Sequence, residues 1–185
     1  MTRYDIINKF IEKYNFNSFL EIGTLYGETF RSVKCKDKES VDPDPNTHPT
    51  HCLPSDEYFE KFNKKFDIIF IDGLHLCEQV DRDIKNALKH LNVGGVIVMH
   101  DCHPWSEETQ VHDVNNHPIA WTGDCWKAFV KNRAEQPFDM YVVDHDCGCG
   151  VIDTNKSKLS DTSALPTDME KMTYSDFVKH PEWMN

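Results

Sequence analysis

The segment FDIIFIDGLH, residues 66–75, decides the fold because an uninterrupted apolar run ends there at a carboxylate. The four residues before Asp72 are apolar, and His75 follows three positions later. A second segment, GGVIVMHDCH at residues 94–103, ends in the same way at Asp101. Strands that are apolar throughout are typical of parallel sheets, in which both faces are covered. The two segments therefore predict buried parallel strands.

Helical patterns separate the predicted strands. Between the two segments lies a helix with one apolar face, and Gly94 and Gly95 are expected to end it. Strands that alternate with amphipathic helices predict an α/β domain with helices on both faces of the sheet. The apolar face of that helix consists of Leu76, Val80, Ile84, Leu88 and Leu91. The other predicted helices cover residues 4–15, a segment from Gly27, 55–65 with Ser55 as N-cap, 122–133 and a piece near 174–178; the other strands cover 18–23, 39–42, a brief piece near 51–53 and two that meet at 144–148.

Composition narrows the classes of partner. The chain has 20 basic and 31 acidic residues, a net charge of −11, which disfavours nucleic acid and anionic membranes as partners. No apolar run of about 18 residues occurs, so we expect no membrane span. Seven cysteines without a framework spacing predict free thiols and a cytoplasmic protein. We expect one domain over residues 1–185, with a core of about 4–152 and a polar extension over 153–185; the oligomeric state stays open.

Acidic residues stand at the ends of the predicted strands, where open parallel sheets bind ligands. If the strands of the two segments are neighbours, they lie about 4.8 Å apart and Asp72 converges with Asp101. Two carboxylates that close repel each other unless a cation or a proton lies between them. This pattern predicts a divalent metal, with His75 near enough to act as a base. The alternative is that each acid caps the following helix or faces water.

The loop EIGTLYGET, residues 21–29, follows the first predicted strand. Gly23 permits a tight turn, and Gly27 opens a helix whose first amides attract an anionic group. Leu25 occupies the position of the middle glycine of the dinucleotide pattern, so the loop is not that motif. Asp42, at the end of the next strand, could accept hydrogen bonds from ribose hydroxyls.

These features in this order resemble the class I S-adenosylmethionine-dependent methyltransferases. Within them, the chain resembles the metal-dependent O-methyltransferases of the catechol and macrolide-sugar types over roughly residues 18–130. The resemblance implies a Rossmann-like, doubly wound, mostly parallel sheet of seven strands with an antiparallel last strand. It assigns cofactor binding to Glu21, Gly23, Thr24, Gly27, Thr29, Asp42, Ser55, Asp56 and Asp72, metal binding to Asp72, His100 and Asp101, and the catalytic base to His75. Within the cofactor site, it implies that Thr29 lies near the methionine carboxylate, Asp42 at the ribose, and Ser55 and Asp56 on the adenine side.

One departure from that pattern bears on the metal. His100 and Asp101 stand where the family has two carboxylates, or a carboxylate and an amide. The resemblance implies Mg²⁺, but histidine suits zinc, iron or nickel better than magnesium, so we expect Mg²⁺ or another divalent metal. Two further stretches, WTGDCWKAF and DHDCGCGVI, are similar to uncharacterised bacterial and phage proteins of the superfamily.

The sequence thus predicts an S-adenosylmethionine-dependent enzyme that methylates an oxygen of a small polar acceptor, such as a sugar or catechol-like hydroxyl. The metal would lower the pKa of that hydroxyl, and His75 would take its proton. Two alternatives stay open: a metal enzyme on the same fold resembling the cephalosporin hydroxylases, and a non-catalytic cofactor-binding or interaction protein. Structural zinc is a further alternative for His145, Cys147 and Cys149 with Cys125.

Overall fold

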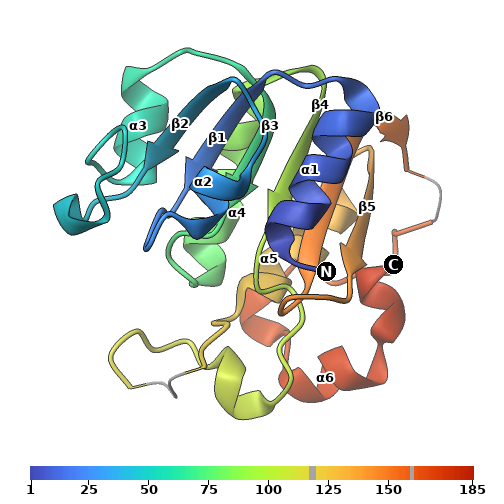
Figure 1. Cartoon of the computed structure of the whole chain (residues 1–185). Helices are drawn as coiled ribbons and strands as arrows, with labels where there is room; N and C mark the ends of the chain where they lie inside the picture. Colours follow the sequence, from blue (N-terminus) through green and yellow to red (C-terminus); the bar gives the residue numbers. More distant parts are fainter. Residues whose placement is uncertain (117–119, 159–160) are drawn as a thin grey trace.

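The computed structural model describes residues 1–116, 120–158 and 161–185. Its six strands form one sheet in the order β2-β1-β3-β4-β6-β5, with helices on both faces (Figure 1). The strands are β1 (Ser18–Ile22), β2 (Asp37–Val41), β3 (Phe66–Ile71), β4 (Leu91–Met99), β5 (Phe138–Val143) and β6 (Cys149–Ser157). The α-helices are α1 (Arg3–Tyr14), α2 (Glu28–Ser32), α3 (Ser55–Lys61), α4 (Cys77–Lys89), α5 (Cys125–Glu135) and α6 (Tyr174–Lys179). Short 3₁₀ turns cover Pro45–Thr47, Glu107–Gln110, Met169–Lys171 and Pro181–Met184.

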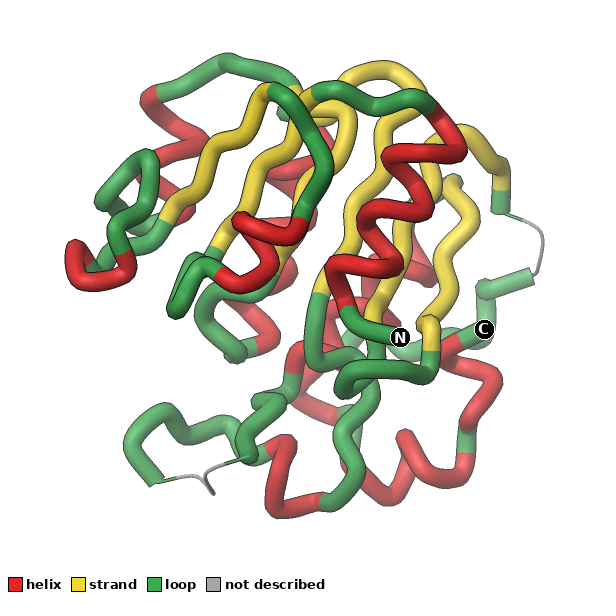
Figure 2. The backbone as a smooth tube through the Cα atoms, in the orientation of Figure 1, coloured by secondary structure: helices red, strands yellow, loops and turns green. Residues whose placement is uncertain are grey.

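Strand β3 shows why this sequence forms a covered sheet. Its side chains alternate between two apolar layers, because successive residues of a strand point to opposite faces. Ile68 and Phe70 pack into the layer beneath α1, and Ile69 and Ile71 pack into the layer beneath α3, α4 and α5. Figure 2 shows the helices of the two layers on opposite sides of the yellow strands. All four side chains are buried, so the strand must be apolar throughout.

The predicted sheet is confirmed in most respects. Strands β1 to β4 pair in parallel, and β6 is antiparallel to both β4 and β5. The predicted seventh strand is not found in the described residues, which have six strands. The brief strand expected near 51–53 is a single bridge between Val41 and His51. Pro49 and Pro54 flank this bridge, and proline cannot donate a backbone hydrogen bond, so pairing does not extend.

The predicted end of the central helix is wrong. Helix α4 ends at Lys89, and Gly94 and Gly95 lie inside β4 instead of ending the helix. The His90 side chain stops the helix, because its ring nitrogens lie 2.8 Å from the Asn86 carbonyl and 2.9 Å from the Phe62 carbonyl. A Cβ on Gly95 would lie 2.7 Å from the Asp67 carbonyl, so this glycine lets the two strands approach closely.

The buried face of α4 is also rotated from the prediction. Val80 and Ile84 are buried, but Leu76 and Leu88 are only half-buried, and Leu91 belongs to β4. Leu88 still packs against the same core, and the buried residues of the helix are Cys77, Val80, Asp81, Asp83, Ile84 and Ala87. The N-cap of α3 is likewise Pro54 and not Ser55, because the Ser55 hydroxyl donates to Asp83 at 2.7 Å.

The segment 161–185 packs beneath the C-terminal edge of the sheet. Met172, Phe177 and Met184 are buried in the same layer as Trp126 of α5. The N-terminal end of α1 lies at this same edge (Figure 1). All seven cysteines are free thiols. No helix in the described part of the chain is both long and apolar enough to span a membrane.

Candidate active site

Strand pairing brings the predicted site residues to one edge of the sheet. Strand β3 lies between β1 and β4, and both pairings are parallel. The backbone continues this pairing past the strand ends: the Asp72 amide donates to the Ile22 carbonyl at 2.8 Å, and the His100 amide donates to the Ile71 carbonyl at 3.0 Å. The predicted adjacency of the strands that carry Asp72 and Asp101 is therefore confirmed.

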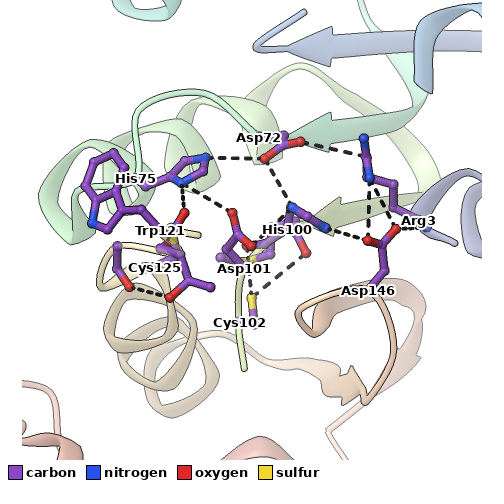
Figure 3. Close-up of polar contacts among 12 residues, drawn as sticks. Arg3, Asp72, His75, His100, Asp101, Cys102, Trp121, Cys125 and Asp146 are labelled. Carbon is purple, nitrogen blue, oxygen red and sulfur yellow. Dashed lines mark hydrogen bonds and ion pairs between the residues drawn. The ribbon is translucent and has the colours of Figure 1, made fainter. Parts of the chain in front are cut away.

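Asp72, His75, His100 and Asp101 form a compact group, called here the acid–histidine cluster (Figure 3). His75 Nε2 lies 3.4 Å from Asp72 Oδ1, and His75 Nδ1 lies 3.3 Å from Asp101 Oδ2. His100 Nδ1 lies 3.4 Å from Asp72 Oδ1 and 3.3 Å from Asp101 Oδ1. Each imidazole thus faces both carboxylates, and each carboxylate faces both imidazoles.

The two histidines offset the repulsion between the two acids. Burial by itself would raise the pKa of Asp72, but the charges and hydrogen bonds of His100 and His75 lower it to about 2. Burial likewise opposes the charged form of His75, yet the neighbouring carboxylates raise its pKa. The pKa of His100 is also raised, against burial, chiefly by Asp72 and Asp101. When no other cation is bound, protonated imidazoles would therefore offset the repulsion between the two acids.

A loop before α5 fixes His75 in place. The indole of Trp121 stacks on the imidazole with ring centroids 5.2 Å apart, and the Trp121 carbonyl lies 3.3 Å from His75 Nδ1. Gly123 has a φ of +58°, and a Cβ there would lie only 1.8 Å from the His75 carbonyl. A side chain at Gly123 would therefore force the loop away from His75.

The donor atoms of the cluster fit a divalent metal. Ligand atoms of Asp72, His75 and Asp101 lie within 4.8 Å of one another, and so do those of His100, Asp101 and Cys147. Imidazole nitrogens and a thiol beside carboxylates suit zinc, iron or nickel better than magnesium. The predicted alternative of a zinc site on His145, Cys147, Cys149 and Cys125 gains no support, since Cys147 groups with His100 and Asp101 among the described residues.

An apolar cavity of about 330 Å³ opens between β1, β2 and the start of α3. Asp42 lies at its rim, and its Oδ2 accepts from the amides of Thr24 at 2.8 Å and Leu25 at 3.2 Å. The carboxylate therefore also holds the glycine loop in shape. The cavity is lined by Ile22, Gly23, Val41, Asp42, Pro43, Pro54, Ser55, Asp56, Gly73, Leu74 and Gln79.

A second, smaller cavity of about 50 Å³ adjoins the first at Gly23. Gly23 has a φ of +87°, and a Cβ there would lie 2.0 Å from the Asp72 carbonyl, so only glycine fits between the cavities and β3. The lining is polar and consists of Arg3, Glu21, Gly23, Thr24, Leu25, Tyr26, Glu28, Thr29 and Asp72.

Two buried polar atoms of this polar cavity have no hydrogen-bond partner. These atoms are Glu21 Oε2 and Thr24 Oγ1, and Glu21 is only 1% exposed. Burial, with a smaller contribution from the nearby Asp72, raises the pKa of Glu21 to about 8. Unpaired buried polar atoms are costly, and a ligand with a hydrogen-bond donor or a positive charge would satisfy them.

Most of the predicted cofactor residues come together around these cavities. Gly23, Asp42, Ser55 and Asp56 line the apolar one, and Glu21, Gly23, Thr24, Thr29 and Asp72 line the polar one. Gly27 lines neither cavity. It is the N-cap of α2, with a φ of +66° and its amide donating to the Thr24 carbonyl at 2.6 Å.

Sequence reasoning missed two residues of the site, Arg3 and Asp146. The Arg3 amide donates to Asp146 Oδ2 at 2.7 Å, and Arg3 Nε donates to the Thr29 hydroxyl at 2.9 Å. Asp146 Oδ1 lies 3.5 Å from His100 Nε2. Arg3 is the first residue of α1, and Asp146 lies in the turn between β5 and β6, 143 residues later. The helical pattern of residues 4–15 predicts α1 but gives no sign of what Arg3 contacts.

Comparison with known proteins agrees with this geometry. Residues 20–102 match the family model of a methyltransferase domain. No curated protein matches the chain in sequence. Among solved structures, the SAH-bound methyltransferase PaMTH1 of Podospora anserina is 16% identical, with a TM-score of 0.60 and coverage of 82% of this chain and 77% of that one. The O-methyltransferase TomG of Streptomyces achromogenes, in complex with SAM, is 13% identical, with a TM-score of 0.58 and coverage of 82% and 79%.

A third structure, the O-methyltransferase of Bacillus cereus in complex with SAH, is 14% identical, with a TM-score of 0.55 and coverage of 82% of this chain and 80% of that one. At these identities the likeness concerns the fold. The family match covers β1 to β4 and the ends of those strands, where both cavities and the acid–histidine cluster lie. The chain thus shares the fold of these methyltransferase structures, and its residues 20–102 match the model of a methyltransferase domain, in agreement with the resemblance seen in the sequence.

Proposed function

We propose that this protein is an S-adenosylmethionine-dependent methyltransferase that modifies a hydroxyl of a small polar acceptor. The observation that carries the proposal is the pair of cavities that meet at Gly23, one apolar and one polar, with the unpaired Glu21 and Thr24 in the polar one. This division matches the cofactor, which has an aromatic nucleoside at one end and a charged amino acid at the other.

Each cavity has the groups that its part of the cofactor requires. In the apolar cavity, Asp42 would accept from the ribose hydroxyls, and Ser55 and Asp56 would face the edge of the adenine. In the polar cavity, the carboxylates of Glu21 and Asp72 would face the sulfonium and ammonium groups. A cation beside Glu21 would favour its ionised form, which burial disfavours in the free chain.

The acid–histidine cluster adjoins the polar cavity because Asp72 belongs to both. Bound S-adenosylmethionine would supply the methyl group, and a divalent metal on Asp72, His100 and Asp101 would acidify the acceptor hydroxyl. A neutral His75, stacked on Trp121, would take the proton of that hydroxyl while its oxygen forms the new bond to the methyl carbon. The bond from that carbon to sulfur would break at the same time and leave S-adenosylhomocysteine. The loop before α5, which contains Trp121, would orient the acceptor and exclude water. The net charge of −11 favours a small acceptor over a nucleic acid.

The test is calorimetric titration of the chain with S-adenosylmethionine and its demethylated product, before and after chelation. We expect binding of both compounds under both conditions. Methyl transfer to a panel of sugars and catechols should then require an added divalent metal. Absence of binding by the folded chain would contradict the proposal. Binding of S-adenosylmethionine without methyl transfer to any acceptor, with each of the metals tested, would support the non-catalytic alternative.

The donor set favours one second candidate, an iron-dependent oxidising enzyme on the same fold. Two imidazoles and two carboxylates provide the ligand types of non-haem iron sites. Oxygen consumption that depends on Fe²⁺, in a chain that does not bind S-adenosylmethionine, would establish this function instead.

A further inference from the structure

We propose that Arg3 binds the carboxylate of the methionine end of S-adenosylmethionine, which makes the start of α1 part of the cofactor site. The inference rests on the proposed function. It adds a specificity-determining residue that comes from outside the matched residues 20–102.

The position of Arg3 is the first argument. Its side chain leaves the first turn of α1 and lines the polar cavity together with Glu21 and Thr24, the residues with unpaired buried atoms. Figure 3 shows the guanidinium between Asp72 and Asp146. Arg3 Nε donates to the Thr29 hydroxyl at 2.9 Å, and Thr29 lines the same cavity, so the guanidinium is held within that cavity.

The charges of the cavity are the second argument. Its lining includes three acids, Glu21, Glu28 and Asp72, and Arg3 is the single cation among the lining residues that the structure describes. The methionine end of the cofactor has two positive groups, the sulfonium and the ammonium, and one negative group, the carboxylate. The acids complement the positive groups, and the carboxylate needs a cation. Arginine suits this role because its planar fork matches a carboxylate with two parallel hydrogen bonds.

The present partners of Arg3 are the third argument, because the carboxylates hold the guanidinium only through long contacts, which a ligand carboxylate could replace. Its nearest carboxylate contacts are 3.3 Å to Asp146, 3.5 Å to Glu28 and 3.9 Å to Asp72. These distances are longer than the 2.7–2.9 Å typical of a close charge-assisted hydrogen bond. The Glu28 side chain is 59% exposed, so that contact is weak and easily exchanged for a ligand. The backbone amide of Arg3 donates to Asp146 at 2.7 Å and anchors the residue. Arg3 Nη1 donates to the two Asp146 oxygens at only 3.3 and 3.5 Å, so the guanidinium could exchange these bonds for a ligand carboxylate while the backbone stays fixed.

The test compares two ligands on two proteins. The ligands are S-adenosylmethionine and its decarboxylated form, which differs only by the missing carboxylate. The proteins are the wild type and Arg3→Met, with Lys9→Met, an exposed residue of the same helix, as the matched control. Calorimetry gives all affinities, and thermal unfolding shows whether each variant is folded. Arg3→Lys, which keeps the charge but loses the fork, is the conservative variant.

Removing Arg3 should weaken the binding of S-adenosylmethionine by roughly 10- to 100-fold, the usual effect of losing a hydrogen bond to a charged group. The affinity for the decarboxylated form should change by less than about threefold. Arg3→Lys should recover part of the loss, and Lys9→Met should bind both ligands as the wild type does. An equal loss for both ligands would mean that Arg3 only holds α1 in place, and no loss would put the carboxylate elsewhere; either result overturns the inference. Failure of the wild type to bind either ligand would instead contradict the proposed function.

Discussion

Replacement of Glu21 by glutamine should stabilise the ligand-free protein at alkaline pH. Glu21 is 1% exposed, one of its oxygens has no partner, and its pKa is raised to about 8 by burial and by Asp72. The protein therefore keeps a buried carboxyl group that is costly to ionise. Glutamine has nearly the same shape and never ionises, so it removes this cost and leaves the packing of β1 almost unchanged.

The sign and the size of the effect follow from linkage. A carboxyl pKa of about 8 in the folded chain, against an ordinary value of 4.5, means that the folded state binds more protons than the unfolded state between these two pH values. The wild type should therefore lose stability as the pH rises from about 4.5 to 8. A pKa difference of one corresponds to about 1.4 kcal/mol, so the loss of unfolding free energy is at most about 5 kcal/mol, and we expect a loss of a few kcal/mol. Glu21→Gln should lack this loss.

The assay is urea unfolding of both proteins at several pH values from 5 to 8.5, with chelator and without cofactor. The difference in unfolding free energy between Glu21→Gln and the wild type should be near zero at the acid end and should grow toward pH 8. Glu12→Gln, an exposed residue of α1, is the control and should follow the wild type. A cationic ligand in the polar cavity should shrink the pH dependence of the wild type. Parallel curves for Glu21→Gln and the wild type would refute the reasoning.

Three further changes test the rest of the molecule. Asp101→Asn should weaken divalent metal binding by at least about 10-fold in calorimetry, with unchanged S-adenosylmethionine affinity, because Asp101 lines neither cofactor cavity and asparagine tolerates its φ of +58°. His75→Gln should lower the rate of methyl transfer by about 10²–10⁴ in a single-turnover assay, whereas His48→Gln, at an exposed loop position, should not; equal rates in both would exclude His75 as the base. Ile84→Ala should destabilise the protein by roughly 2–5 kcal/mol in urea, and the half-buried Leu88→Ala by less; the reverse order would contradict the observed face of α4.

The sequence by itself determined the sheet and which acids meet at its edge. Apolar runs that stop at Asp72 and Asp101 require strands buried on both faces, because no other arrangement covers every side chain of β3. A helix between such strands makes them parallel, so their carboxyl ends meet at one edge. Local pattern and simple geometry were therefore enough to bring these acids together and to place the glycine loop at the same edge of the sheet.

Local pattern was not enough where competing local signals gave the wrong answer. Gly94 and Gly95 suggested a helix end, but the helix ends earlier, at the His90 side chain, and Gly95 instead lets β3 approach β4 closely. The helical pattern of α4 could not reveal that Cys77 and Ala87 are buried while Leu88 packs against the same core only half-buried. In both cases a partner far away in the sequence decides the outcome.

Only the tertiary structure decided how the site is completed. The sequence placed His75 as a base near one acid, but the folded chain sets His75 and His100 each between both carboxylates. Arg3 and Asp146 are 143 residues apart in the sequence and meet at the edge of the sheet where the strands β1, β3 and β4 end. Their contact depends on how α1 and the turn between β5 and β6 dock on that edge. Such docking is fixed by the packing of the whole core, and no local period of the sequence encodes it.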